Sequence, residues 1–141
     1  ILVKIMFFKS KDNNKENELS KVAALLIYAA KIDQDFSEKE EIIIKRTILA
    51  IGAKKEDVDK IIYEGKEIEN NSNQILEFTK KVKNMSENDK IKILESLWRI
   101  IYSNKEIDMY EANLMRRLAG LLYIDSKIMG DIKERVKKEN S

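Results

Sequence analysis

The chain has 141 residues, of which 43% are hydrophobic and 37% charged, with 27 basic and 25 acidic side chains and a formal net charge of +2. The apolar content predicts one domain with a buried core, and the lysines interleave with glutamates instead of forming the basic footprint of a nucleic-acid-binding protein. The sequence contains no Cys and no His, which excludes disulfides, thiolate or imidazole zinc sites, and catalysis by either side chain.

Residues 1–8 are strongly apolar but too short for a membrane span, which needs about 18 apolar residues. They also lack the small-residue cleavage site of a secretory signal. Two interpretations stay open: a first helix that packs on the core, or a short anchor that contacts a membrane surface or a partner. We predict a cytoplasmic protein, peripheral to the inner membrane if the anchor interpretation holds.

Residues 9–18 have no apolar member, which is typical of a linker. We therefore divide the chain into an N-terminal apolar segment with its linker, residues 1–18, and a helical domain, residues 19–141. Apolar residues at helical spacing predict a first helix over residues 19–32. Ser37 and Glu40 then form a capping-box pattern that opens a second helix, and Gly52 closes it.

Apolar spacing predicts five more helices. They cover residues 57–68, 75–82, 91–102, 111–122 and 128–136. Ser86, Asp108 and Asp125 precede three of them as capping residues. Trp98 lies on a strongly apolar helix, which favours core packing. No segment alternates with period two for long enough to predict a strand, so the fold class is all-α.

Residues 33–40 return in altered form at residues 104–111, an offset of 71. An apolar helix leads into each copy, and an amphipathic helix leads out with one arginine in register, Arg46 and then Arg117. A fixed offset indicates two pseudo-symmetric helix–acidic turn–helix units. Each arginine is either a solvated surface residue or the partner of a carboxylate in the opposite unit.

The two acidic turns and their flanks resemble the TerB-like, tellurite-resistance-associated family. The more specific match is in the second half of the chain, which resembles an alphaproteobacterial branch of that family. It consists of Phe78-Thr79, Leu94-Glu-Ser-Leu-Trp98, Ile107-Asp-Met-Tyr-Glu111 and Leu114-Met-Arg-Arg-Leu-Ala-Gly-Leu-Leu122. The resemblance covers residues 19–137. It implies a compact bundle of about seven helices, with a link to metal or chemical stress at the cytoplasmic membrane.

This chain departs from the family motif at both turns. Where the family usually has Asp-Gly, the first turn has Asp33-Gln34 and the second has Asn104-Lys105. The second turn thereby loses one carboxylate and gains a positive charge. Any cation site should therefore be centred on the first turn.

The first turn supplies the oxygen ligands that Ca²⁺ or Mg²⁺ prefers. We predict a divalent-cation site at Asp33, Asp35 and Glu40, either alone or joined across the pseudo-symmetry by Glu106 and Glu111. Helix capping is the alternative for Glu40 and Glu111, because each follows a capping residue by three positions. Capping does not explain both aspartates of the first turn.

No nucleophile with a base, glycine-rich phosphate loop or catalytic triad is recognisable, so we do not expect an enzyme. The main hypothesis is a non-enzymatic TerB-like module that acts by contact with a protein partner in a stress or tellurite-resistance-type response, modulated by a divalent cation. The alternative is a purely structural adaptor that contacts the membrane through residues 1–8 and has no metal role.

Overall fold

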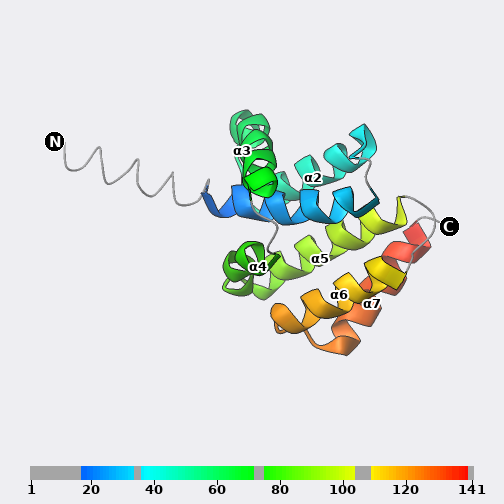
Figure 1. Cartoon of the computed structure of the whole chain (residues 1–141). Helices are drawn as coiled ribbons and strands as arrows, with labels where there is room; N and C mark the ends of the chain where they lie inside the picture. Colours follow the sequence, from blue (N-terminus) through cyan, green and yellow to red (C-terminus); the bar gives the residue numbers. More distant parts are fainter. Residues whose placement is uncertain (1–16, 34–35, 72–74, 104–108, 140–141) are drawn as a thin grey trace.

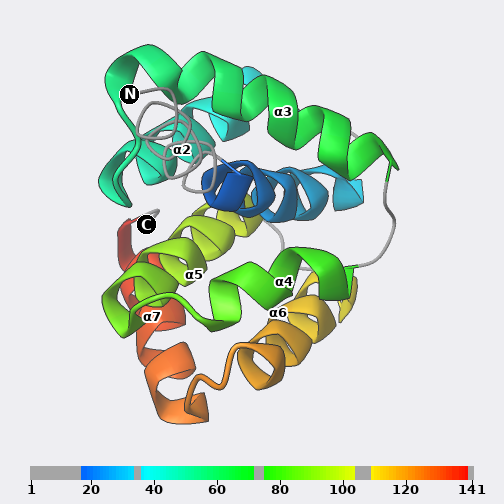
Figure 2. The same ribbon diagram turned by 90° about the vertical axis from the view of Figure 1, so that its left-hand side faces the viewer.

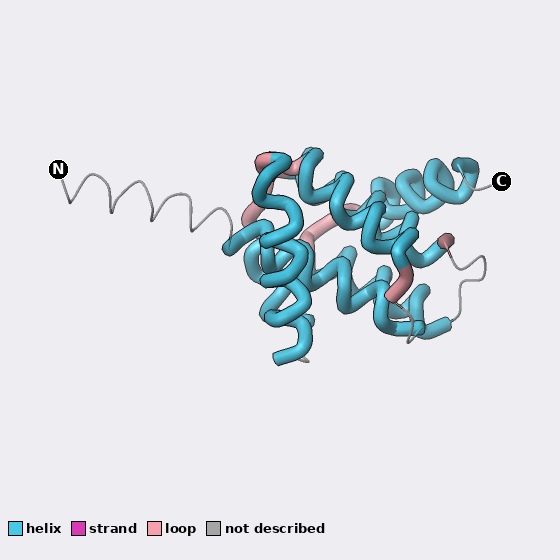
Figure 3. The backbone as a smooth tube through the Cα atoms, turned by 90° about the horizontal axis from the view of Figure 1, so that it is seen from above, coloured by secondary structure: helices cyan, strands magenta, loops and turns pink. Residues whose placement is uncertain are grey.

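The computed structural model describes residues 17–33, 36–71, 75–103 and 109–139, whose regular structure is entirely helical. The all-α prediction is confirmed for this part of the chain, with seven α-helices joined by short loops (Figure 3). An N-terminal helix, residues 17–30, runs into the 3₁₀ turn η1 (Lys31–Asp33). There follow α2 (Glu38–Ala50), η2 (Lys55–Asp57), α3 (Val58–Asn71), α4 (Ile75–Lys83), α5 (Glu87–Tyr102), α6 (Met109–Leu121) and α7 (Ser126–Glu139).

The chain is already helical at residue 17, two residues before the predicted start of the domain at Leu19. Residues 17 and 18, which were predicted to end the linker, therefore belong to the first helix. Residues 1–8 and the rest of that linker lie outside the described residues. None of the described helices combines the length and the apolar character that crossing a membrane requires.

The N-terminal helix occupies the middle of the bundle, between α3 and α5 (Figures 1 and 2). Six consecutive residues, 22–27, have no exposed surface. A helix that is apolar all round must be covered on every side. The surrounding helices therefore pack on it as a shared core element.

The second buried helix is α5, and its buried positions match those of the N-terminal helix at the offset of 71. Val22, Leu26 and Ala30 correspond to Ile93, Leu97 and Ile101, and all six are buried. α5 packs on both α7 and α2. The matching burial is what two copies of one helical unit would produce.

The helices α2 and α6 end with the same cap, again 71 residues apart. The Ala53 N–H donates to Ile48 O at 3.1 Å, and the Ile124 N–H donates to Ala119 O at 2.9 Å. These bonds are typical of the Schellman motif, which needs a left-handed residue just before the donor. Gly52 adopts φ 117° in the first cap, and Tyr123 adopts φ 57° in the second. A tyrosine there carries a backbone cost of about 1–2 kcal/mol that glycine avoids.

Gly65 allows α3 to approach the N-terminal helix closely. A Cβ atom on Gly65 would lie 2.7 Å from Ala23 Cβ and 3.2 Å from both Ala24 N and Ser20 O. Beside this contact, the Ser20 hydroxyl donates to Glu64 Oε2 at 2.8 Å. Two of the three near atoms belong to backbone, so a side chain can be fitted only by moving a helix.

We predict that Gly65→Ala destabilises the fold. Glycine to alanine inside a helix normally stabilises by about 1 kcal/mol, but overpacking of a close helix contact costs about 1–3 kcal/mol. Urea unfolding should therefore show a net loss of up to about 2 kcal/mol in the free energy of unfolding.

The matched control is Gly130→Ala in α7, where an added Cβ would meet nothing within 4 Å. This variant should gain up to about 1 kcal/mol. Equal effects of the two substitutions would contradict a tight contact at Gly65.

Candidate functional site

The first acidic turn ends in a complete capping box at the start of α2. Ser37 has the extended backbone of an N-cap, with φ −87° and ψ 162°. Its Oγ accepts the Glu40 N–H at 3.2 Å, while Glu40 Oε1 accepts the Ser37 N–H at 3.0 Å and the Ser37 hydroxyl at 2.9 Å. The predicted capping role of Glu40 is therefore present.

Capping satisfies only one of the two carboxylate oxygens of Glu40. The side chain is 1% exposed, and Oε2 has no hydrogen-bond partner among the described residues. A buried carboxylate normally has both oxygens satisfied, because leaving one without a partner costs free energy. A bound cation would supply the partner that this oxygen lacks.

Glu111 occupies the equivalent position of the second unit. It lies in the first turn of α6 and is 2% exposed. Among the other predicted ligands, Asp33 ends η1. The side chain of Asp33, together with Asp35 and Glu106, lies outside the described residues. The structure therefore places two of the five predicted ligands, and the metal site stays a prediction.

Within the described ranges, no group of three or more acidic side chains is arranged to hold a metal ion. Glu40 would need the aspartates of its own turn to complete a coordination sphere, because a Ca²⁺ site takes six to eight oxygen ligands. Any test of the site must therefore address Asp33 and Asp35 directly.

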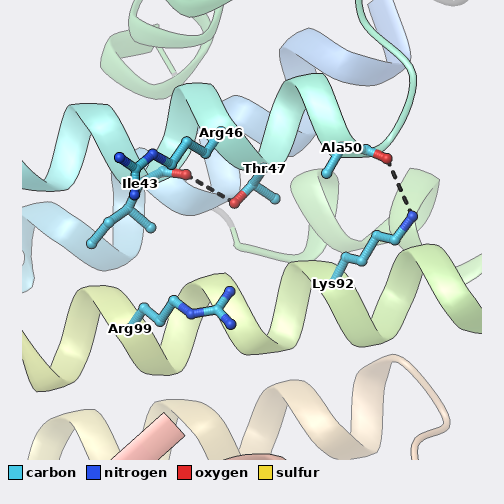
Figure 4. Close-up of a pocket in the computed structure, with 6 residues that line it drawn as sticks. All are labelled: Ile43, Arg46, Thr47, Ala50, Lys92 and Arg99. Carbon is cyan, nitrogen blue, oxygen red and sulfur yellow. Dashed lines mark hydrogen bonds between the residues drawn. The ribbon is translucent and has the colours of Figure 1, made fainter. Parts of the chain in front are cut away.

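Arg46 and Arg117 have no ion pair among the residues that the structure describes, so the predicted inter-unit salt bridge is not found there. Each arginine instead lines a groove of about 250 Å³. The Arg46 groove lies between α2 and α5 (Figure 4) and is lined by Ile43, Arg46, Thr47, Ala50, Lys92 and Arg99. The Arg117 groove lies between the N-terminal helix and α6 and is lined by Tyr28, Ile32, Asn113, Leu114 and Arg117.

Among the described residues, three cations and no acidic residue line the Arg46 groove. Lys92 Nζ donates to Ala50 O at 3.2 Å, across the gap between α5 and the end of α2 (Figure 4). Arg99 is paired with Glu139 of α7 at 3.0 Å and, less closely, with Glu95 at 3.5 Å. Hydrogen bonding to Glu139 raises the pKa of Arg99 against the opposing effect of burial. Arg46 and Lys92 therefore carry the uncompensated charge of this groove.

A family model described as tellurite resistance protein TerB matches residues 19–134. The chain belongs to the TerB family. Searches among curated proteins and among solved structures each found no match. The family resemblance expected from the acidic turns is thus confirmed, and the matched range runs from the N-terminal helix into α7.

Trp98 of the TerB domain is 4% exposed, which confirms its predicted place in the core. Trp98 lies beside another cavity of about 220 Å³, whose lining includes Met115 of α6 and Met129 of α7. The Tyr102 ring packs against the Trp98 ring in a tilted arrangement, with ring centroids 5.9 Å apart. Burial, followed by the charge of Glu134, raises the pKa of Tyr102.

The repeat in the TerB sequence drew attention to Arg46 but not to Lys92 and Arg99, which share its groove. These two residues lie on a different helix and belong to the other unit. Their separation of seven residues places them on one face of α5, and this spacing is the signal that was available. The spacing does not indicate that this face of α5 packs beside α2.

We predict a small, pH-dependent contribution from the Arg99–Glu139 pair. The hydrogen bond from Arg99 lowers the pKa of Glu139 below its ordinary 4.5. A carboxyl group whose pKa is lowered by folding stabilises the fold at any pH above its ordinary pKa. This contribution is lost as the pH falls through the lowered pKa of the folded state. The pair is partly exposed, so Glu139→Gln should reduce the free energy of unfolding at pH 7 by less than about 1 kcal/mol.

Urea unfolding at pH 7 and in acid well below pH 4.5 measures this difference, which should vanish in acid. Glu134→Gln is the control, because it removes the same charge from α7 at a residue without an ion pair among the described residues. A Glu139→Gln deficit that persists in acid would show that packing, not charge, is responsible.

Proposed function

We propose that this TerB-family chain is a non-enzymatic module that acts by contact with a protein partner, in a tellurite-resistance-type or stress response, and that a divalent cation at the first acidic turn modulates this contact. The observation that carries the cation part is the orphaned Oε2 of Glu40, buried beside a turn that contains Asp33 and Asp35. Capping leaves that oxygen unsatisfied, and a bound cation would satisfy it.

The chemistry of the donors fits a hard cation. Carboxylate oxygens suit Ca²⁺ or Mg²⁺, and the sequence offers no histidine or cysteine for a softer metal. Asp33, Asp35 and Glu40 would supply the first ligands, with Glu106 and Glu111 from the second unit. When bound, the ion would supply positive charge that neutralises the buried carboxylate.

The location of these donors suggests how a cation would affect the surface. Asp33 ends η1 and Glu40 lies in the first turn of α2. A cation shared by both residues would restrain α2 relative to the N-terminal helix. α2 also carries two exposed aliphatic side chains, Ile42 and Leu49, and exposed large apolar side chains are a feature of protein contact surfaces.

We predict that millimolar Ca²⁺ or Mg²⁺ raises the melting temperature of the wild-type chain. A ligand that binds only the folded state must stabilise it, by about 1.4 kcal/mol at ten times its dissociation constant. Asp33→Asn/Asp35→Asn should abolish the shift. Circular dichroism melts with and without each cation measure it.

The matched control is Asp131→Asn/Glu134→Gln, which removes two charges from α7 and should keep the shift. Glu40→Gln offers a second test, since glutamine serves equally in a capping box but lacks the charge, and this variant should also lose the shift. No shift in the wild type, or an equal shift in Asp33→Asn/Asp35→Asn, would refute the cation site.

A further inference from the structure

The outer face of α2 presents an aliphatic stripe interrupted by one cation. Ile42 is 50% exposed and Leu49 is 42% exposed, and they are two of the four most exposed large hydrophobic residues in the described ranges. Arg46 lies between them at positions i, i+4 and i+7, a spacing that places all three on one helix face. We call Ile42, Arg46 and Leu49 the α2 stripe.

The α2 stripe borders the Arg46 groove, because Arg46 belongs to both. Figure 4 shows Arg46 on α2 and Arg99 on α5 lying on either side of the gap, with Lys92 reaching across it to Ala50. The groove thus offers an apolar wall at Ile43 and positive charge from two helices. With Arg99 already paired to Glu139, the charge available to a ligand is that of Arg46 and Lys92.

We propose that the α2 stripe and the Arg46 groove together form a docking site for an acidic amphipathic segment of a partner protein. Aliphatic side chains of the segment contact Ile42 and Leu49, and its carboxylates pair with Arg46 and Lys92. Arginine suits this role because its guanidinium binds a carboxylate through two parallel hydrogen bonds. The proposal rests on the proposed function as a protein-contact module and assigns that contact a surface and a partner chemistry.

Charge favours this occupant over a second copy of the chain. Two copies meeting through the α2 stripe about a two-fold axis would bring their Arg46 side chains toward each other, and like charges facing each other oppose association. An acidic segment meets the same surface with complementary charge. Its aliphatic side chains also cover the stripe, which a nucleic-acid backbone would leave exposed to water.

The second unit provides an internal comparison. At the offset of 71, Arg46 corresponds to Arg117, but Ile42 and Leu49 correspond to Asn113 and Gly120. Arg99 corresponds to Tyr28, which lines the Arg117 groove. Lys92 corresponds to Lys21, which lines a different pocket. Among the described residues, the Arg117 groove thus keeps the arginine, has no second cation in its lining, and lacks the aliphatic pair. The docking site therefore lies at α2 and its groove with α5 and has no equivalent at α6, so Arg117 supplies a matched control.

The test begins with selection from a phage-displayed random library of peptides of about 16 residues, a length that forms a helix able to fill a groove, against the full immobilised chain. Enriched peptides should combine an excess of Asp and Glu with spaced aliphatic residues. Fluorescence anisotropy of one labelled peptide should then show affinity reduced by about tenfold or more in Arg46→Glu and in Ile42→Ser/Leu49→Ser. Arg117→Glu should bind as wild type, and added salt should weaken binding.

All four substituted residues are exposed, and thermal melts confirm that each variant is folded. Enrichment of basic peptides, or an equal loss in Arg117→Glu, would overturn the docking site. So would self-association of the chain that Ile42→Ser/Leu49→Ser abolishes, since the occupant would then be a second copy. Peptides that bind regardless of Arg46→Glu would overturn this surface alone, whereas the enrichment of no peptide would also overturn the proposed contact function.

Discussion

The burial of two strongly apolar helices governs the architecture of this TerB domain. The N-terminal helix and α5 are apolar around most of their circumference, so each must be surrounded by other helices to be stable in water. α2 and α3 cover one, while α2 and α7 pack against the other. Once both buried helices are enclosed, the first turns of α2 and α6 are packed against the core, with Glu40 and Glu111 buried. The position of every candidate site follows from this enclosure.

The same enclosure explains the environment of Glu40. As a capping residue it must lie in the first turn of α2, and the packing of that turn against the core removes it from water. An exposed capping glutamate would satisfy its second oxygen with solvent. Here Oε2 has no such partner among the described residues. Glu40 thus caps α2 and is at the same time a buried carboxylate with one unsatisfied oxygen, which is why the cation proposal centres on this residue.

Positions related by the offset of 71 residues match in part of their burial and differ in the side chains around it. Thr47 and Ser96 form a buried hydrogen bond of 2.7 Å between α2 and α5, whereas the corresponding residues are the buried leucines Leu118 and Leu25. The caps differ in the same way, with Gly52 matched by the strained Tyr123. Because the buried framework is kept and the surfaces around Arg46 and Arg117 have diverged, the first unit is the better candidate for function.

The sequence by itself determined the features that depend on neighbours along the chain. The all-α class follows from apolar spacing, and the caps at Ser37, Ser86 and Asp125 follow from local hydrogen bonding. The offset between the units and the family resemblance are likewise readable without coordinates. These features needed no knowledge of which helices meet.

Tertiary structure alone decided the features that depend on helices meeting. The unsatisfied oxygen of Glu40 appears only when α2 is packed on the core, and the close approach at Gly65 appears only when α3 crosses the N-terminal helix. Lys92 and Arg99 join Arg46 in one groove because α5 lies beside α2. Helical periodicity fixes which face a residue occupies, but the partner of that face is set by the packing of the whole bundle.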